Sequence, residues 1–161
     1  RAQHYEKAFE LDPTDMVYLL NKGAVHLTKK EYDESIAACH KAVEVGQENR
    51  ADFKMLAKAY ARIAKAYQTQ EKYEDAMHFY DKALANHREQ DYIRQRKACE
   101  KALKEQQRLA YIDPALSLEA KQRGNNFFRE GKFPDAVREY TEAIKRNPED
   151  AKLYRCVRWP R

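Results

Sequence analysis

The chain has 161 residues, of which 35% are charged, with four Gly and five Pro. This composition favours helices over sheets, and no uncharged stretch approaches the roughly 18–20 apolar residues of a membrane span. The formal net charge of +5 would permit nucleic-acid binding. Acidic and basic residues are finely interspersed, however, which is typical of solvated helix faces, so we expect neither a membrane nor a nucleic-acid partner.

The reactive side chains do not form recognisable catalytic or metal-binding patterns. Cys39, Cys99 and Cys156 are widely spaced without a CxxC motif, which is typical of reduced thiols in a cytoplasmic protein. The five His residues never stand in metal-ligand spacing with Cys or with each other. Glycines do not cluster into a phosphate loop, and no Ser/His/Asp or Cys/His arrangement stands out beyond chance. We therefore expect no enzyme activity, no cofactor and no metal.

Helical patterns follow one another along the whole chain and predict an all-α protein. The predicted helices cover residues 2–11, 16–28, 32–45, 51–69, 73–86, 91–112, 118–129 and 134–146, and a further helix begins at Ala151. The long helix over residues 91–112 has a narrow apolar stripe, and Asp113-Pro114 interrupts the chain after it. We thus predict a module over residues 1–90 with a truncated first repeat, a connecting helix over 91–113, and an incomplete second module over 114–161.

An internal repeat organises these helices. The aromatic residues Tyr32, Tyr73 and Phe133 each precede a small residue by three positions, and a second small residue follows seven positions after the first. The intervals between the three aromatic residues are 41 and 60 residues, which indicates a unit of roughly 34 residues with insertions. The best copy covers residues 117–150, and its small residues allow two helices to approach closely. These are Gly124, Ala136 and Ala143.

This pattern of small and large residues resembles the tetratricopeptide (TPR) family. The resemblance implies a solenoid of helix pairs that forms a right-handed superhelix, with a long connecting helix over residues 91–113. In this family the first helix of each pair lines a concave groove that holds extended peptides. The sequence therefore resembles a protein-interaction module.

Three polar residues are candidates for the chemistry of that groove. Lys58 and Arg62 are four residues apart, so they share one helical face, and Asn21 is the inward-facing candidate of the preceding repeat. Two cations and an amide suit a carboxylate, because each can donate hydrogen bonds to its oxygens. Spacing alone leaves a simpler alternative open, in which Lys58 and Arg62 only solvate an exposed face.

A closer resemblance favours carboxylate binding. The strings Glu10-Leu-Asp-Pro-Thr14, Ala57-Lys-Ala-Tyr-Ala-Arg62 and Tyr140-Thr-Glu-Ala-Ile-Lys-Arg-Asn-Pro148 are similar to the central region of the Hop family of co-chaperones. Members of this family organise the seventy- and ninety-kilodalton heat-shock proteins and hold their acidic C-terminal peptides in a five-residue carboxylate clamp. The resemblance covers residues 1–154 and assigns Asn21, Lys58 and Arg62 to the last three clamp positions.

The same resemblance makes both clamps incomplete. The Lys and Asn of the first clamp's first helix would precede Arg1, and we expect the truncated first repeat to promote self-association. In the second module Lys121 and Asn125 match the first pair of a clamp, but the next position falls at Cys156. The alternative function is a general TPR scaffold that binds an internal peptide motif.

The end of the chain departs from the repeat. Tyr154 stands at a large position that is expected to pack on the preceding pair, whereas Arg158 occupies a position that requires a small residue. Pro160 cannot continue a helix. The helix that begins at Ala151 is therefore expected to fray after about Cys156.

Overall fold

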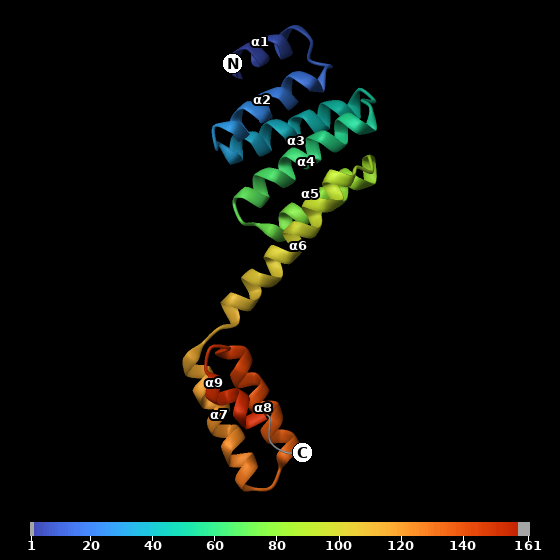
Figure 1. Ribbon diagram of the computed structural model, residues 1–161. Coiled ribbons are helices and arrows are strands. Elements are labelled where there is room, and N and C mark those ends of the chain that lie inside the picture. Colours follow the sequence, from blue (N-terminus) through green and yellow to red (C-terminus); the bar gives the residue numbers. More distant parts are fainter. Residues whose placement is uncertain (1, 158–161) are drawn as a thin grey trace. The chain divides into compact units, whose positions relative to one another are not determined.

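The computed structural model describes residues 2–157, and within that range it contains nine α-helices and no strand (Figure 1). The helices are α1 (Ala2–Leu11), α2 (Met16–Thr28), α3 (Tyr32–Glu48), α4 (Phe53–Thr69), α5 (Tyr73–Asn86), α6 (Gln90–Tyr111), α7 (Pro114–Arg129), α8 (Phe133–Arg146) and α9 (Ala151–Val157). The chain divides into two compact units, residues 1–104 and 105–161.

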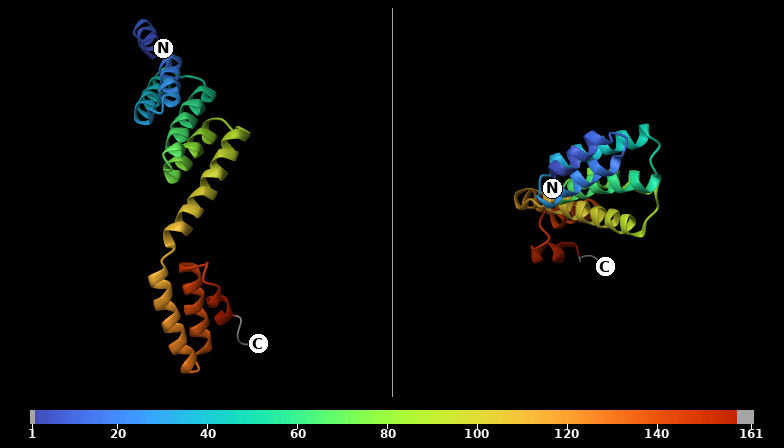
Figure 2. Two further views of the ribbon diagram at one scale, coloured as in Figure 1. Left: turned by 60° about the vertical axis from the view of Figure 1, so that its left-hand side comes forward. Right: turned by 90° about the horizontal axis from the view of Figure 1, so that it is seen from above.

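The first unit is a stack of helix pairs. Helices α2 and α3 form one antiparallel pair and α4 and α5 the next, while α1 packs against α2 (Figure 2). In the second unit α7 and α8 form a pair, and α9 packs against α8. The predicted all-α solenoid of helix pairs is confirmed.

Short polar side chains decide where several helices begin. Asp15 accepts a hydrogen bond from the Val17 amide at 2.8 Å and so caps α2. Asp113 accepts from the backbone amides of two residues in the first turn of α7, and Pro114 provides a backbone angle suited to that turn. Helix α7 therefore begins at Pro114 and not at residue 118 as predicted from the sequence.

Each turn within a helix pair has the same backbone geometry. Lys30, Glu71 and Gly131 adopt left-handed φ angles of 65°, 60° and 73°. Each stands two residues before the first residue of the second helix of its pair. Lys30 and Glu71 are 41 residues apart, the same interval that separates Tyr32 from Tyr73. The two repeats of the first unit are therefore in register from residue to residue.

Small residues allow close contact between paired helices, as the repeat predicted. A Cβ atom at Gly124 would lie 2.7 Å from a ring carbon of Tyr140, so this glycine is required for the contact of α7 with α8. At Gly23 the corresponding neighbour is Cys39, whose Sγ would lie 2.5 Å from such a Cβ. The two helix pairs thus use one packing mode.

Helix α6 is packed at its beginning and exposed towards its end. Tyr92 and Cys99 are buried in the core that also contains Tyr80. Residues 104–111 are all exposed. Ion pairs within the helix connect Glu100 with Lys104 at 3.0 Å and Glu105 with Arg108 at 2.7 Å. The predicted apolar stripe is therefore buried only in the first half of the helix.

The short helix α9 is held by a residue that the repeat pattern did not indicate. Leu153 is fully buried in a small core with Ala120 and Ala143. Tyr154 is 49% exposed, and its hydroxyl donates a hydrogen bond to the Pro148 carbonyl at 3.0 Å. The expectation that Tyr154 packs on the preceding pair is wrong. Leu153, one position earlier, packs there instead. Helix α9 is described as far as Val157, and Arg158 and Pro160 lie outside the described residues.

Candidate functional site

A pocket of about 380 Å³ opens on the first unit beside α4. Its charged residues are Lys58, Arg62 and Lys65 of α4 and Asp91 of α6, so three cations face one carboxylate. The remaining lining residues are Leu27, Ala61, Tyr80, Tyr92 and Gln95. The excess of positive charge favours an anionic ligand.

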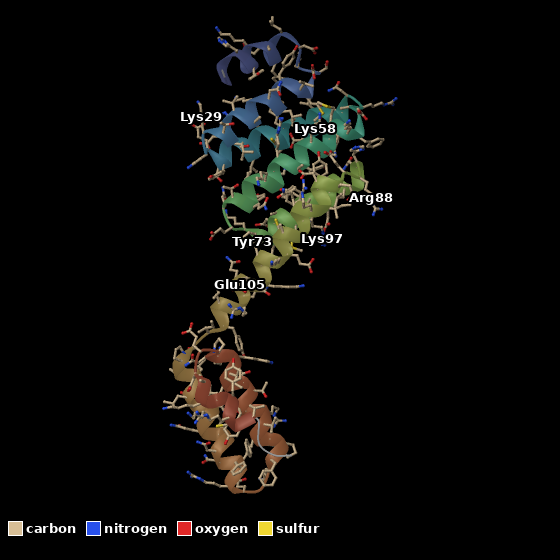
Figure 3. All side chains as sticks on the ribbon, in the orientation of Figure 1. Lys29, Lys58, Tyr73, Arg88, Lys97 and Glu105 are labelled. Atoms are coloured by element: carbon tan, nitrogen blue, oxygen red, sulfur yellow. The ribbon has the colours of Figure 1, made fainter. Side chains whose placement is uncertain are left out.

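The three cations share one face of α4 because they stand at helical spacings of four and three residues. Lys58 is exposed (Figure 3), whereas Arg62 is half-buried. Lys65 continues the face by a further turn and is exposed. The predicted pairing of Lys58 with Arg62 in one site is therefore present in the geometry of the pocket.

The guanidinium of Arg62 is fixed by the neighbouring repeat. Its Nη1 donates a hydrogen bond to the Leu20 carbonyl of α2. Burial lowers the pKa of Arg62, and the nearby Cys39 and Tyr92 oppose that shift. A guanidinium remains protonated at neutral pH despite such a shift. Arg62 therefore presents a permanent charge in one orientation and also connects α4 to α2.

Asn21 follows Leu20 directly and is half-buried on α2. It does not belong to the lining of the pocket. The hydrogen bond from Arg62 to the Leu20 carbonyl nevertheless brings the guanidinium to the turn of α2 that carries Asn21. Of the three predicted residues, the pocket thus unites two, and the third stands on the adjoining turn.

Helix α6 supplies a wall that the sequence analysis did not assign to the site. Tyr92 is buried, and that burial together with the nearby Glu89 raises the pKa of its hydroxyl to about 12. The side-chain oxygen of Gln95 accepts a hydrogen bond from Gln68 at 3.3 Å, and Gln68 accepts one from Tyr80 at 3.0 Å. This chain of hydrogen bonds holds the wall in place.

One of the missed residues had a signal in the sequence. Lys65 stands three residues after Arg62 and seven after Lys58, so helical spacing alone assigns it to their face. Tyr92 and Gln95 had no comparable signal, since their place depends on how α6 packs against α4 and α5.

The second unit carries the other predicted pair. Lys121 and Asn125 are both half-buried on α7, four residues apart. The Lys121 Nζ lies 3.9 Å from an Asp150 carboxylate oxygen, and the Asn125 side-chain oxygen accepts a hydrogen bond from the Tyr140 hydroxyl at 2.8 Å. That hydrogen bond occupies the Asn125 oxygen, and the NH₂ group of the same side chain is a hydrogen-bond donor.

The described residues include polar side chains that can bind a ligand, but no cluster of side chains typical of a metal centre. Within residues 2–157 no three His, Cys, Asp or Glu side chains are gathered in a way that could hold a metal ion. None of the helices described there has the length and apolar character needed to cross a membrane. The chemistry of the first pocket is that of charge-assisted hydrogen bonding to an anion.

Comparison with known proteins agrees with this architecture. Two family models described as tetratricopeptide repeat match residues 15–89 and 121–155. Stress-induced-phosphoprotein 1 of Caenorhabditis elegans is 44% identical over 94% of this chain and 47% of its own length. Hsp70-Hsp90 organizing protein 2 of Arabidopsis thaliana is 46% identical over 94% of this chain and 27% of its own length. The chain thus spans less than half the length of these curated relatives.

A solved structure extends the comparison to three dimensions. The TPR2AB domain of yeast Sti1, in a complex with pHSP90, matches with a TM-score of 0.91 and 39% identity. The match covers 97% of this chain and 60% of the Sti1 chain. By repeat pattern, sequence and fold, the chain belongs to the tetratricopeptide-repeat family and is similar to the Hsp70-Hsp90 organizing proteins.

Proposed function

We propose that the groove of the first unit binds the acidic C-terminal peptide of the ninety-kilodalton heat-shock protein through a carboxylate clamp. Lys58 and Arg62 bind the terminal carboxylates, and Asn21 donates its amide to a carboxylate oxygen or accepts from a peptide NH. The observation that carries this proposal is the shared pocket of Lys58 and Arg62, with its excess of positive charge. The named relatives and the yeast complex with pHSP90 support the choice of partner.

The physical basis of binding is charge-assisted hydrogen bonding at a partly desolvated site. Each such hydrogen bond contributes roughly 1.5–3 kcal/mol. Because Arg62 is already held by the Leu20 carbonyl, little side-chain entropy is lost when a carboxylate binds to it. Lys58 is exposed and is ordered by the ligand instead.

The second unit extends this function to a second tail. Lys121 and Asn125 supply the first pair of another clamp, which suits the tail of the seventy-kilodalton heat-shock protein. A cytoplasmic adaptor with two such modules brings the two chaperones together and performs no chemistry of its own.

The test is calorimetric titration of the full chain with one acidic chaperone-tail peptide, either as the free acid or with an amidated C-terminus. Amidation is expected to weaken binding at least tenfold, because the terminal carboxylate loses its charge. Lys58→Ala should weaken the free acid similarly, and the matched control Lys97→Ala, an exposed lysine on α6, should not. Equal binding of both peptide forms would instead favour a general TPR scaffold that binds an internal motif.

A further inference from the structure

A second and larger pocket, of about 740 Å³, lies between α1, α2 and α3. Its apolar lining includes Phe9, Leu19 and Ala38, and His26 and Lys41 also line it. The Lys41 Nζ lies 5.2 Å from the centre of the Phe9 ring. The pocket thus combines an apolar surface with an ammonium group that already contacts an aromatic ring.

This pocket is separate from the proposed clamp. Leu19, Lys22 and His26 of α2 line it, and with about 100° per residue they fall within an arc of roughly 60°. By the same rule Asn21 lies roughly 100° or more from each of them around the helix axis. The two sites therefore use different faces of α2.

One repeat later, the equivalent position is filled by the protein itself. The Phe79 ring of α5 is stacked with Tyr67 at 5.5 Å and with Tyr60 at 6.4 Å between centroids. The His40 ring meets it edge-on at 5.4 Å. The Lys82 Nζ lies 5.2 Å from the centre of the Phe79 ring. An aromatic ring beneath a lysine thus occupies the groove between α3, α4 and α5.

The register of 41 residues aligns the two grooves side chain by side chain. The alignment pairs Leu19 with Tyr60, His26 with Tyr67, Ala37 with His78, Ala38 with Phe79 and Lys41 with Lys82. The lysine is thus retained, and the ring that fills the later groove is replaced by the methyl group of an alanine. A missing benzyl group at this position explains why a large pocket opens here.

We propose that this pocket binds a phenylalanine or tyrosine side chain presented by a peptide segment of a partner protein. The ring takes the place that Phe79 has in the next repeat. It packs against Leu19 and His26, and the Lys41 ammonium lies over its face. Burial of the ring supplies most of the stabilisation, and the cation–π contact selects an aromatic ring over an aliphatic side chain.

The probe is the blocked peptide acetyl-Gly-Ser-Phe-Ser-Gly-amide, titrated into the full ¹⁵N-labelled chain. It carries no carboxylate, so the proposed clamp has no ligand group to bind. We expect saturable shifts of the Leu19, Ala37 and Ala38 amides, and at least tenfold weaker binding when Ala replaces Phe in the peptide. Lys58→Ala should leave the affinity unchanged, which separates this pocket from the clamp. Shifts that are absent at these amides, or equal for both peptides, would overturn the proposal.

Variants of the pocket sharpen the test. Ala38→Phe should fill the pocket as Phe79 does, keep or raise the thermal midpoint, and weaken the peptide at least tenfold. Lys41→Ala should weaken it about two- to fivefold. The control Lys54→Ala, an exposed lysine on α4, should have no effect. If a folded Ala38→Phe chain bound the peptide as tightly as the original chain, the ring would bind elsewhere. If Ala38→Phe did not fold, unchanged binding by Lys41→Ala would show the same.

Discussion

The two cations of the proposed clamp differ in what they do for the protein alone. Lys58 is exposed, whereas Arg62 is half-buried and donates a hydrogen bond from α4 to the Leu20 carbonyl of α2. Truncation of either side chain removes a charge from the groove. Only truncation of Arg62 also removes a connection between two repeats. We therefore expect Lys58→Ala and Arg62→Ala to weaken tail binding alike and to differ in stability.

The expected difference follows from the hydrogen bond. A hydrogen bond from a charged donor contributes roughly 1.5–3 kcal/mol. The Leu20 carbonyl lies inside α2 and can also accept from the backbone four residues on, so the loss for Arg62→Ala should be at the lower end of this range, about 1.5–2 kcal/mol. For a unit of this size that lowers the thermal midpoint by roughly 5–10 °C. Lys58→Ala should change the free energy of unfolding by less than about 0.5 kcal/mol.

Two measurements test this reasoning on the same samples. Calorimetric titration with an acidic tail peptide should show a loss of about tenfold or more for both variants, and thermal denaturation should separate them. Arg62→Lys keeps the charge without the planar guanidinium, so it should retain more binding than Arg62→Ala. Equal thermal midpoints for Lys58→Ala and Arg62→Ala would refute the structural role of Arg62. Unchanged peptide binding by Arg62→Ala would refute the clamp.

Three further outcomes are expected. Leu153→Ala should cost the second unit about 2–4 kcal/mol of unfolding free energy in urea titrations, against less than about 1 for Tyr154→Ala, because only the leucine is fully buried. Burial raises the pKa of the Cys39 thiol from 9.0 to about 11, so the unfolded chain ionises first as the pH rises above 9. The free energy of unfolding should then fall by up to about 1.4 kcal/mol per pH unit as far as pH 11, and Cys39→Ala should remove that part of the slope. We also propose self-association through the first repeat, where Leu11 is 89% exposed, and sedimentation equilibrium should detect a weaker dimer for Leu11→Lys.

The arrangement of the helices could be predicted because it depends on local signals. The aromatic and small residues from Tyr32 and Tyr73 onward repeat in register, and caps such as Asp15 mark helix starts. The sequence predicts the start of α7 four residues too late, because Asp113-Pro114 also fits an interruption of the chain. In this context the aspartate caps the helix and the proline begins it.

The site was predictable only where its residues share one helix. The spacing of Lys58 and Arg62 predicts that they share one helical face, and the same rule adds Lys65. Their assignment to a ligand comes from the family resemblance and not from the spacing. The contact of Arg62 with the Leu20 carbonyl and the wall formed by Tyr92 depend on how separate helices pack. No periodicity within a single helix contains that information.

The exposed half of α6 affects how the chain should respond to proteases. Residues 104–110 bury no side chain, so opening this stretch disrupts little beyond its own backbone hydrogen bonds and weak surface ion pairs. Trypsin at low dose should therefore cut first after Lys104 or Arg108, although both lie within a continuous helix. Salt weakens the ion pairs that Lys104 and Arg108 form with Glu100 and Glu105, so the cut should become faster as ionic strength rises.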